Sequence, residues 1–136
     1  MRYLLLMLAL IATPLSAKEK PVVDAVLFYS PKCPHCHKAI EQTIKPLTHK
    51  YGAQFQLVMV DIDTPEGQEL FQNAMRKYSV PKSKRVVPFM IVGSTLLIGS
   101  DEIERRLSFL IDKGLAAGGR KLPNIKGLAE AVPNPT

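Results

Sequence analysis

Cysteine is scarce in this sequence, and its scarcity limits what the two cysteines can do. The 136 residues include only Cys33 and Cys36, which two other residues separate. Small domains that depend on disulfides for stability usually carry four or more cysteines. A bridge across so short a loop would also restrict the unfolded chain far less than one that closes a long loop. A structural disulfide is therefore a poor explanation of the pair.

The sequence also lacks an apolar run of comfortable membrane-spanning length at its start. The run LLLMLALIA at 4–12 follows a positive Arg2 and precedes TPLSA, which supplies a helix breaker and small residues. A membrane helix needs about 20 apolar residues, whereas this pattern is typical of a secretory signal peptide. We expect residues 1–17 to be such a peptide, cleaved after Ala17, or alternatively an uncleaved anchor. In either case residues 18–136 would work outside the cytoplasm, in the periplasm or secreted.

No basic stretch is interleaved with aromatic side chains, although the formal net charge is +6. Proteins that bind nucleic acids gather lysine and arginine on one face or along one helix. Here these residues are scattered, and the densest run, KSKR at 82–85, lies among prolines and valines in what is expected to be a solvated loop. We therefore expect no nucleic-acid partner. The chain also has no internal repeats, and its length suits one domain with a hydrophobic core.

A strand followed at once by a helix is expected around the two cysteines. The continuous apolar run VVDAVLFYS at 22–30 is rich in β-branched and aromatic residues, which predicts a buried strand. Pro34 suits the first position of a helix, where no backbone N–H is needed. Cys33 would then be the N-cap residue, and Cys36 would lie one turn further on and point inward. Pro46 should kink or break this helix.

The rest of the chain predicts a mixed sheet. The segments are, in chain order, a strand at 54–62, a helix beginning at Thr64-Pro65-Glu66, a proline-marked loop at 80–88, strands at 89–93 and 95–99 around a Gly93-Ser94 turn, and a last helix. A crossover helix implies that the first two strands are parallel, whereas the hairpin adds antiparallel strands. We expect Ser100 to cap the last helix and Gly114 to end it. The domain would span 18–113, followed by an extended Gly- and Pro-rich tail at 114–136 that packs partly on it.

The order of elements, the CPHC motif between the first strand and helix, and a Val-Pro pair before the third strand resemble the thioredoxin superfamily. The resemblance covers about residues 21–113 and implies a thioredoxin-like α/β fold with a central mixed sheet flanked by helices. CPHC is the active-site motif of the disulfide oxidase DsbA, but the stretch from Cys36 to Pro88 leaves no room for the helical domain inserted there. The compact layout is more like thioredoxin and glutaredoxin. The stretches VGSTLLIGSDEIERRL and GGRKLPNIKGL resemble small bacterial extracytoplasmic thioredoxin-like proteins.

The resemblance implies an exported protein thiol–disulfide oxidoreductase in which Cys33 is the nucleophile and Cys36 resolves the mixed disulfide. The attacking species is a thiolate. At an N-cap, its charge is favoured by the helix dipole and by N–H groups of the first turn, here those of His35 and Cys36. Lys32, Pro34 and His35 are the residues placed to tune it. Because this stabilisation acts only on the reduced form, it makes the protein a stronger oxidant.

The same resemblance assigns Val87 and Pro88 to substrate binding. Pro88 would be the family's cis-proline, which lies against the two cysteines and presents backbone groups to a substrate peptide. The alternative is a trans proline that opens a strand, because an X-Pro bond is cis in only about 5–6% of cases in folded proteins.

One position departs from the family. Thioredoxin and DsbA carry a buried carboxylate six positions before the first active-site cysteine, where this sequence has Leu27. Asp24 lies three residues earlier on the same strand and should not replace it. Proton transfer to and from Cys36 would therefore use water or another group.

The expected partners are cysteine-containing protein substrates and a redox partner, for which a membrane-bound protein is one candidate. An oxidase must be re-oxidised and a reductase must be fed electrons, and the sequence does not identify the protein that does either. We expect a monomer without a cofactor.

A c-type haem protein is an alternative, because CPHCH satisfies the attachment pattern. His37 would be one axial ligand, and Met59, Met75 or Met90 the second. Cytochromes c are mostly helical, however, and this motif follows a predicted strand. We therefore expect His37 to be a helix-surface residue near the active site.

A zinc or copper site, or a copper relay, is the other alternative, with Cys33, Cys36, His35 and His37 as ligands. Four donors within five residues of a regular helix do not easily surround one ion. Such a site would need a partner or a dimer.

Overall fold

The computed structural model describes residues 19–132, so the signal segment expected at 1–17 lies outside the described residues. No helix between residues 19 and 132 is both long and apolar enough to cross a bilayer. The elements in this range are β1 (Val23–Tyr29), α1 (Pro34–Ala39), η1 (Ile40–Ile44), α2 (Lys45–Tyr51), η2 (Gly52–Gln54), β2 (Phe55–Asp61), α3 (Pro65–Lys77), η3 (Lys82–Lys84), β3 (Phe89–Val92), β4 (Thr95–Ile98), α4 (Ser100–Ala116) and α5 (Leu128–Ala131).

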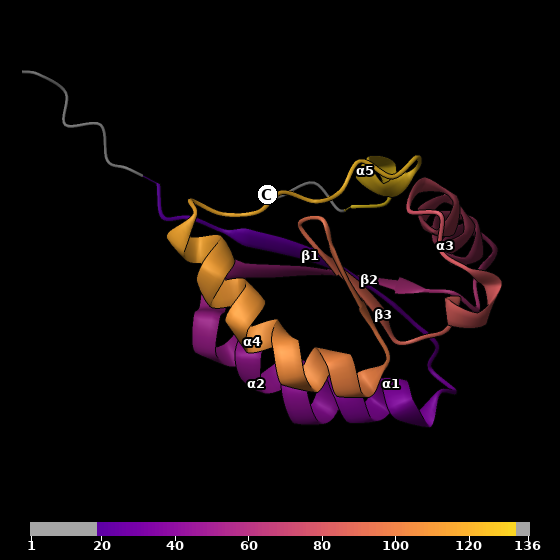
Figure 1. The fold of residues 1–136 in the computed structure, drawn as a ribbon, viewed down its shortest axis with the longest axis horizontal. Coiled ribbons are helices and arrows are strands. Elements are labelled where there is room, and N and C mark those ends of the chain that lie inside the picture. The colour runs from indigo at the N-terminus through magenta and orange to yellow at the C-terminus, as the bar shows by residue number, and fades with distance from the viewer. Residues whose placement is uncertain (1–18, 133–136) are drawn as a thin grey trace, which may run out of the picture.

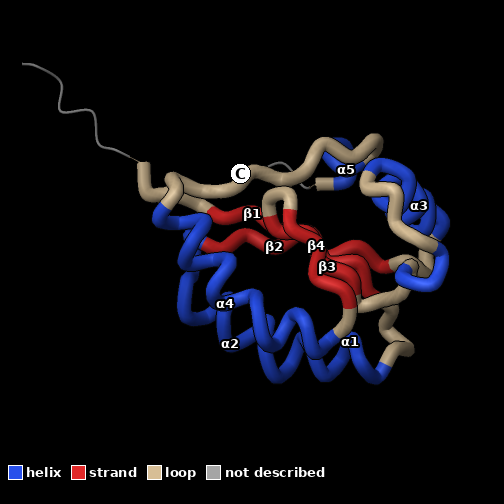
Figure 2. The backbone as a smooth tube through the Cα atoms, in the orientation of Figure 1, coloured by secondary structure: helices blue, strands red, loops and turns tan. Residues whose placement is uncertain are grey.

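The four strands form one mixed sheet in the order β2-β1-β3-β4. Strand β1 is parallel to β2, with Tyr29 opposite Asp61, and antiparallel to β3, with Phe28 opposite Phe89. Figure 1 shows α1, α2 and α4 on one side of the sheet and α3 and α5 on the other, and Figure 2 shows the strands between these two layers. The predicted order of elements and the thioredoxin-like α/β architecture are confirmed, with one additional helix, α5.

Alternate residues of β1 supply two separate hydrophobic cores. Ala25 and Leu27 are fully buried in the core beneath α1, α2 and α4. Val26 and Phe28 are fully buried in the core beneath α3 and the C-terminal segment. The ring centroids of Phe28 and Phe71 lie 5.3 Å apart in a tilted arrangement, which contributes about 0.5–1.5 kcal/mol beyond the buried area. The continuous apolar run that forms β1 is therefore explained by burial of both faces of the strand.

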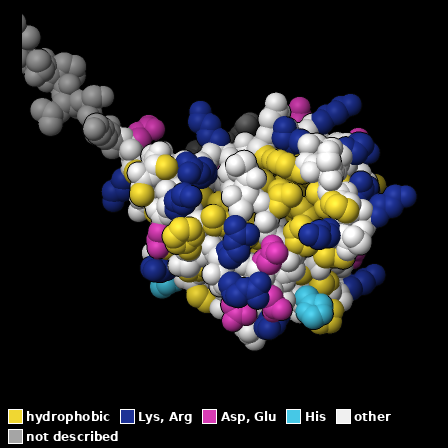
Figure 3. All heavy atoms as spheres, viewed as in Figure 1, with side chains coloured by type: hydrophobic (Ala, Val, Ile, Leu, Met, Phe, Trp, Pro, Cys, Tyr) yellow, Lys and Arg dark blue, Asp and Glu magenta, His cyan; other side chains and the backbone are white. Residues whose placement is uncertain are grey.

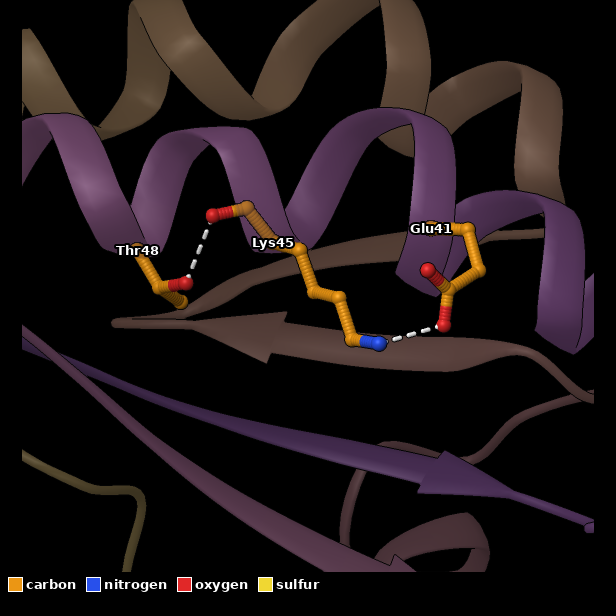
Figure 4. A network of polar contacts seen from close by, with 3 residues as sticks. All are labelled: Glu41, Lys45 and Thr48. Carbon is orange, nitrogen blue, oxygen red and sulfur yellow. Dashed lines mark hydrogen bonds and ion pairs between the residues drawn. The ribbon is translucent and has the colours of Figure 1, made fainter.

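Pro46 causes an irregularity in the first helix without breaking it. A proline cannot donate a backbone hydrogen bond, and the turn before it is π-helical, with the Lys45 N–H donating to the carbonyl of Ile40. The chain continues directly into α2. Figure 4 shows the exposed polar contacts along this join, an ion pair from Lys45 to Glu41 and a hydrogen bond from the Thr48 hydroxyl to the Lys45 carbonyl. Exposed pairs of this kind stabilise little, so packing of the buried face holds the helix.

The predicted cap of the last helix is wrong. Ser100 is the first residue of α4, its N-cap is Gly99, and the cap has no side-chain hydrogen bond. Gly99 has a φ of 89°, which a side chain would make unfavourable. The nearby backbone donor Ile98 N–H is satisfied from the helix itself, by the carboxylate of Glu102 at 2.8 Å.

The predicted end of the last helix is also wrong. Gly114 is buried within α4, which continues to Ala116. A Cβ atom at Gly114 would lie 2.7 Å from the Cγ2 atom of Val23. Glycine is therefore needed for close packing of α4 on β1. The chain turns out of the helix at Gly118 and Gly119, where φ is 92° and 110°.

The described part of the C-terminal segment belongs to the domain. Arg120 forms a parallel bridge with Val23, and its carbonyl accepts from the Asp24 N–H at 2.8 Å. Ile125 and Leu128 are buried in the core of the α3 side. The prediction was an extended tail that packs partly on the domain, and the short helix α5 that begins at Leu128 was missed. Figure 1 shows α5 beside α3.

Candidate active site

Cys33 occupies the N-cap of α1, as predicted. Its backbone is extended, with φ −93° and ψ 115°, and its sulfur accepts a hydrogen bond from the Cys36 N–H at 3.2 Å. Of the two donors expected, the structure shows this one and not the N–H of His35. The loop before the helix is held by a bond from the Cys33 N–H to the Ser30 carbonyl at 3.1 Å. A half-buried sulfur is thus fixed at the positive end of a helix.

Cys36 is fully buried, which confirms its predicted inward orientation. Burial, together with the hydrogen bond that the Cys36 thiol makes to Cys33, raises the pKa of the Cys36 thiol to about 12. A hydrogen bond from the Ser30 backbone lowers this pKa, whereas the charges of Cys33 and Asp63 raise it. Cys36 therefore keeps its proton at neutral pH. Both cysteines are free thiols in this structure.

The Val87–Pro88 peptide bond is cis, as predicted. The carbonyl oxygen of Val87 accepts from the Cys33 thiol at a donor–acceptor distance of 3.8 Å. Val86, just before, is 48% exposed. The backbone ahead of β3 therefore borders the sulfur, although a role for Val87 and Pro88 in substrate binding stays a prediction.

The residues expected to tune the thiolate, Lys32, Pro34 and His35, are all exposed. They adjoin Cys33 in the chain, and in the described structure none of them hydrogen-bonds its sulfur. Their role in tuning the thiolate stays a prediction.

The donors of the proposed metal site do not gather. Between residues 19 and 132, no group of three or more His, Cys, Asp or Glu side chains lies close enough to hold a metal ion. The Nε2 atom of His37 lies 2.6 Å from the Pro31 carbonyl oxygen. Of the methionines considered as haem ligands, Met75 and Met90 are fully buried in the two cores, and Met59 is 44% exposed on β2.

Two polar residues that the sequence analysis missed lie beside the cysteines. The Ser30 hydroxyl donates to the Oδ2 atom of Asp63 at 2.9 Å and accepts from the Lys32 N–H at 3.2 Å. Ser30 follows the end of β1, and Asp63 lies two residues past the end of β2. Because Tyr29 pairs with Asp61 in parallel register, both strands end at the same edge of the sheet. Polar residues just beyond two adjacent parallel strands were the signal that could have found them.

The position six residues before Cys33, where thioredoxin and DsbA carry a carboxylate, lies in an apolar core. Leu27 is fully buried on the α1 side of the sheet. Asp24 is half-buried, and it belongs to the opposite face because side chains alternate along a strand. Burial raises the pKa of the Asp24 carboxyl. As expected, Asp24 does not take the place of the family's carboxylate.

No protein-family model and no curated protein match this sequence. Among solved structures, the thioredoxin Deadhead of Drosophila melanogaster is 22% identical with a TM-score of 0.47, over 68% of this chain and 80% of that one. A thioredoxin from Thermus thermophilus is 25% identical with a TM-score of 0.48, over 68% and 73% of the two chains. A glutaredoxin from Brucella melitensis is 25% identical with a TM-score of 0.43, over 79% and 100%. The strand order β2-β1-β3-β4 shows that this chain has a thioredoxin-like fold, and the Cys-x-x-Cys pair Cys33 and Cys36 lies between β1 and the first turn of α1.

Proposed function

We propose that this protein is an exported thiol–disulfide oxidoreductase that exchanges disulfides with protein substrates through Cys33 and Cys36. One observation carries the proposal, the asymmetry of the pair. The sulfur of Cys33 is half-buried at a helix N-terminus and accepts from the Cys36 N–H at 3.2 Å. Cys36 is fully buried. Cys33 is the more accessible thiol, and its surroundings stabilise a thiolate, which suits the nucleophile. Cys36 is shielded from solvent, which suits the group that resolves the mixed disulfide.

In the oxidising direction, the protein begins with a Cys33–Cys36 disulfide. A substrate thiolate attacks the Cys33 sulfur, and Cys36 leaves with the electron pair and takes up a proton. A second substrate thiolate then attacks the substrate sulfur of the mixed disulfide, so that Cys33 leaves as a thiolate. The substrate loses two electrons and the protein gains them. A partner that accepts two electrons must restore the disulfide.

The helix N-terminus supports oxidation as the preferred direction. The hydrogen bond from the Cys36 N–H and the dipole of α1 stabilise a negative sulfur on Cys33. That negative sulfur exists only in the reduced protein. Stabilising the reduced form raises the reduction potential, and a protein with a higher potential donates its disulfide more readily.

The surroundings of Cys33 support a peptide as the substrate. The Val87 carbonyl borders its sulfur, and the preceding Val86 is 48% exposed. An extended peptide lying along this backbone would bring a cysteine side chain to the sulfur. Export is supported by the composition of residues 1–17, an arginine followed by a short apolar run and small residues.

A disulfide-transfer experiment tests the function. The oxidised protein is mixed with an equal amount of a reduced peptide that contains two cysteines, and both are followed by mass spectrometry after acid quenching. We expect the disulfide to move to the peptide, and no such transfer from Cys33→Ser or Cys36→Ser proteins. A peptide that stays reduced would contradict the proposal. Cell fractionation and N-terminal sequencing of the purified protein test export and cleavage.

A further inference from the structure

A small polar cavity lies at the end of the sheet that is remote from the two cysteines. It has a volume of about 170 Å³ and is lined by residues of the β3–β4 hairpin, of α4 and of the segment after α4, namely Val92, Ser94, Thr95, Leu110, Lys113 and Arg120. Strand β3 is antiparallel to β1, so the turn after Val92 lies toward the start of β1, whereas Cys33 follows the end of β1. Figure 1 shows this turn away from the start of α1. The cavity is therefore separate from the candidate active site.

Arg120 is held in place by its backbone and by two glycines. Its N–H donates to the Val22 carbonyl at 3.0 Å, and the residue forms a parallel bridge with Val23. A Cβ atom at Gly93 would lie 2.9 Å from the Cδ atom of Arg120, and a Cβ atom at Gly114 would lie 3.1 Å from its Cγ atom. The aliphatic part of the side chain thus lies between the hairpin turn and α4. This packing limits the positions that the guanidinium group can take.

Arg120 is not needed to cap α4, because backbone donors satisfy carbonyls of its last turn. The Lys113 carbonyl accepts from the Ala117 N–H at 3.1 Å. The Gly114 carbonyl accepts from the Gly119 N–H at 2.8 Å. Among the described residues, the one hydrogen bond of the guanidinium group goes to the Gly119 carbonyl at 3.1 Å, beyond the end of the helix. A guanidinium group has five N–H donors, so most of them are available to another acceptor.

The charge at the cavity is entirely positive. Lys113 and Arg120 line it, and its lining contains no acidic residue. Within residues 19–132 the only ion pair joins Lys45 to Glu41, so neither Lys113 nor Arg120 pairs with a carboxylate there. Two cations and the two hydroxyl side chains of the hairpin therefore surround one small cavity.

We propose that this cavity binds a phosphate group, held by Arg120 and Lys113 and by the hydroxyl groups of Ser94 and Thr95. A guanidinium group can donate two parallel hydrogen bonds to phosphate oxygens, and a lysine adds a compact positive charge. A phosphate monoester carries about −1.5 to −2 charges at pH 7, which two cations balance more closely than they balance a single carboxylate. The cavity is smaller than the roughly 300–1,000 Å³ of sites for drug-sized ligands, which favours a small group. This site is independent of the proposed redox chemistry.

Calorimetric titration of the purified protein with inorganic phosphate, at constant ionic strength, tests the site. We expect one phosphate per protein. Arg120→Gln should weaken binding by about tenfold or more, because it removes charge-assisted hydrogen bonds, and Lys113→Gln should also weaken it. Lys121→Gln is the matched control, because it removes the same charge from the next residue, which is exposed and does not line the cavity. Its affinity should equal that of the parent, and acetate should bind the parent more weakly than phosphate.

Two sources can present the same phosphate group, a free small molecule and a lipid headgroup. Sedimentation with phosphatidylcholine vesicles, with and without phosphatidic acid, distinguishes them. A lipid headgroup predicts that the parent and Lys121→Gln sediment with the phosphatidic acid vesicles and that Arg120→Gln does not. A free phosphate compound predicts the differences in the calorimetric titration without this difference in sedimentation.

Four results would overturn the site. The first is a parent that neither binds phosphate saturably in the millimolar range nor sediments in a way that depends on Arg120. The second is equal weakening in Arg120→Gln and Lys121→Gln with both probes, which would show attraction to the overall positive charge. The third is acetate that binds as tightly as phosphate. The fourth applies if circular dichroism shows that Arg120→Gln does not fold, and it is an unchanged affinity in Lys113→Gln.

Discussion

The sulfur of Cys33 lies 3.8 Å from the carbonyl oxygen of Val87, although 54 positions separate the two residues in the chain. The contact joins the start of α1 to the backbone just before β3. It exists because β1 and β3 are adjacent and antiparallel, so that the end of β1 and the start of β3 lie at the same edge of the sheet. We therefore predict that a substrate bound at Cys33 also contacts the backbone around Val87.

The two cysteines should behave differently when each is left alone. A reduced Cys36→Ala protein should attack a peptide disulfide through Cys33 and remain as a stable mixed disulfide, because no resolving thiol is left. A Cys33→Ala protein should form little or none, because Cys36 is fully buried and keeps its proton. Mass spectrometry of the alkylated mixtures measures both. Equal yields from the two variants would show that the nucleophile has been misassigned.

Gly114→Ala should destabilise the protein, although alanine is normally favoured over glycine inside a helix by about 1 kcal/mol. A Cβ atom at this position would lie 2.7 Å from Val23 Cγ2 and 3.1 Å from Arg120 Cγ. Overpacking of this kind typically costs about 1–3 kcal/mol. Urea unfolding measures the change in the free energy of unfolding.

Val23→Ala supplies the control, because it removes the atom that the new methyl group would meet. The double variant should lose less stability than the sum of the two single variants. Additive losses would mean that the helix does not pack on β1 at Gly114 as closely as the structure shows.

The features that could be predicted from sequence are those that neighbouring residues determine. Pro34 directly after Cys33 marks the helix start, and the run that becomes β1 marks a strand buried on both faces. The prediction that Ser100 is the N-cap was wrong, although a serine before two acidic residues fits that position by local rules. Gly99 is the N-cap instead, with a φ of 89°. Local sequence does not show whether the helix takes its N-cap from the serine or from the glycine before it.

The features that were missed depend on contacts between distant segments. Local rules predict that a glycine such as Gly114 ends a helix. Only its close packing against Val23 shows why glycine is needed at this position. Ser30 and Asp63 are 33 positions apart, and their hydrogen bond follows from the parallel register of β1 and β2. The sequence could place both residues just beyond neighbouring parallel strands, but the exact pairing register, and with it the hydrogen bond, is a property of the folded sheet.

Asp24 should make stability fall as the pH rises. Burial raises the pKa of its carboxyl in the folded protein above the ordinary value of 3.8. In the interval just above that value the folded state holds the proton more strongly than the unfolded state, so the free energy of unfolding decreases with pH there. Asp24→Asn should therefore gain stability relative to the parent as the pH rises above 3.8, as denaturant unfolding at each pH measures. Glu104→Gln, at an exposed position of α4, should show no such trend, and equal trends in both variants would contradict the assignment to Asp24.

The reduction potential should lie toward the oxidising end of the range found among Cys-x-x-Cys oxidoreductases, between about −180 and −120 mV. Two features stabilise a negative Cys33 sulfur, which exists only in the reduced form. The Cys36 N–H donates to it at 3.2 Å, and the dipole of α1 points its positive end toward it. In addition, the buried position six residues before Cys33 holds Leu27, which carries no negative charge. Equilibration with glutathione buffers of known ratio, followed by alkylation and mass spectrometry, measures the potential.

The imidazole of His35 can be replaced without disturbing the hydrogen bond from the Cys36 N–H to Cys33. Its side chain is exposed in the first turn, and the structure assigns the bond to the N–H of Cys36 instead. His35→Gln should shift the potential toward more reducing values if a through-space charge contributes, whereas His37→Gln, whose ring lies against the Pro31 carbonyl, should shift it less. Equal potentials in the parent and His35→Gln would leave the backbone of α1 as the source of the stabilisation. A parent potential of about −270 mV, the value typical of thioredoxin, would contradict the oxidising direction and favour a role as a reductase.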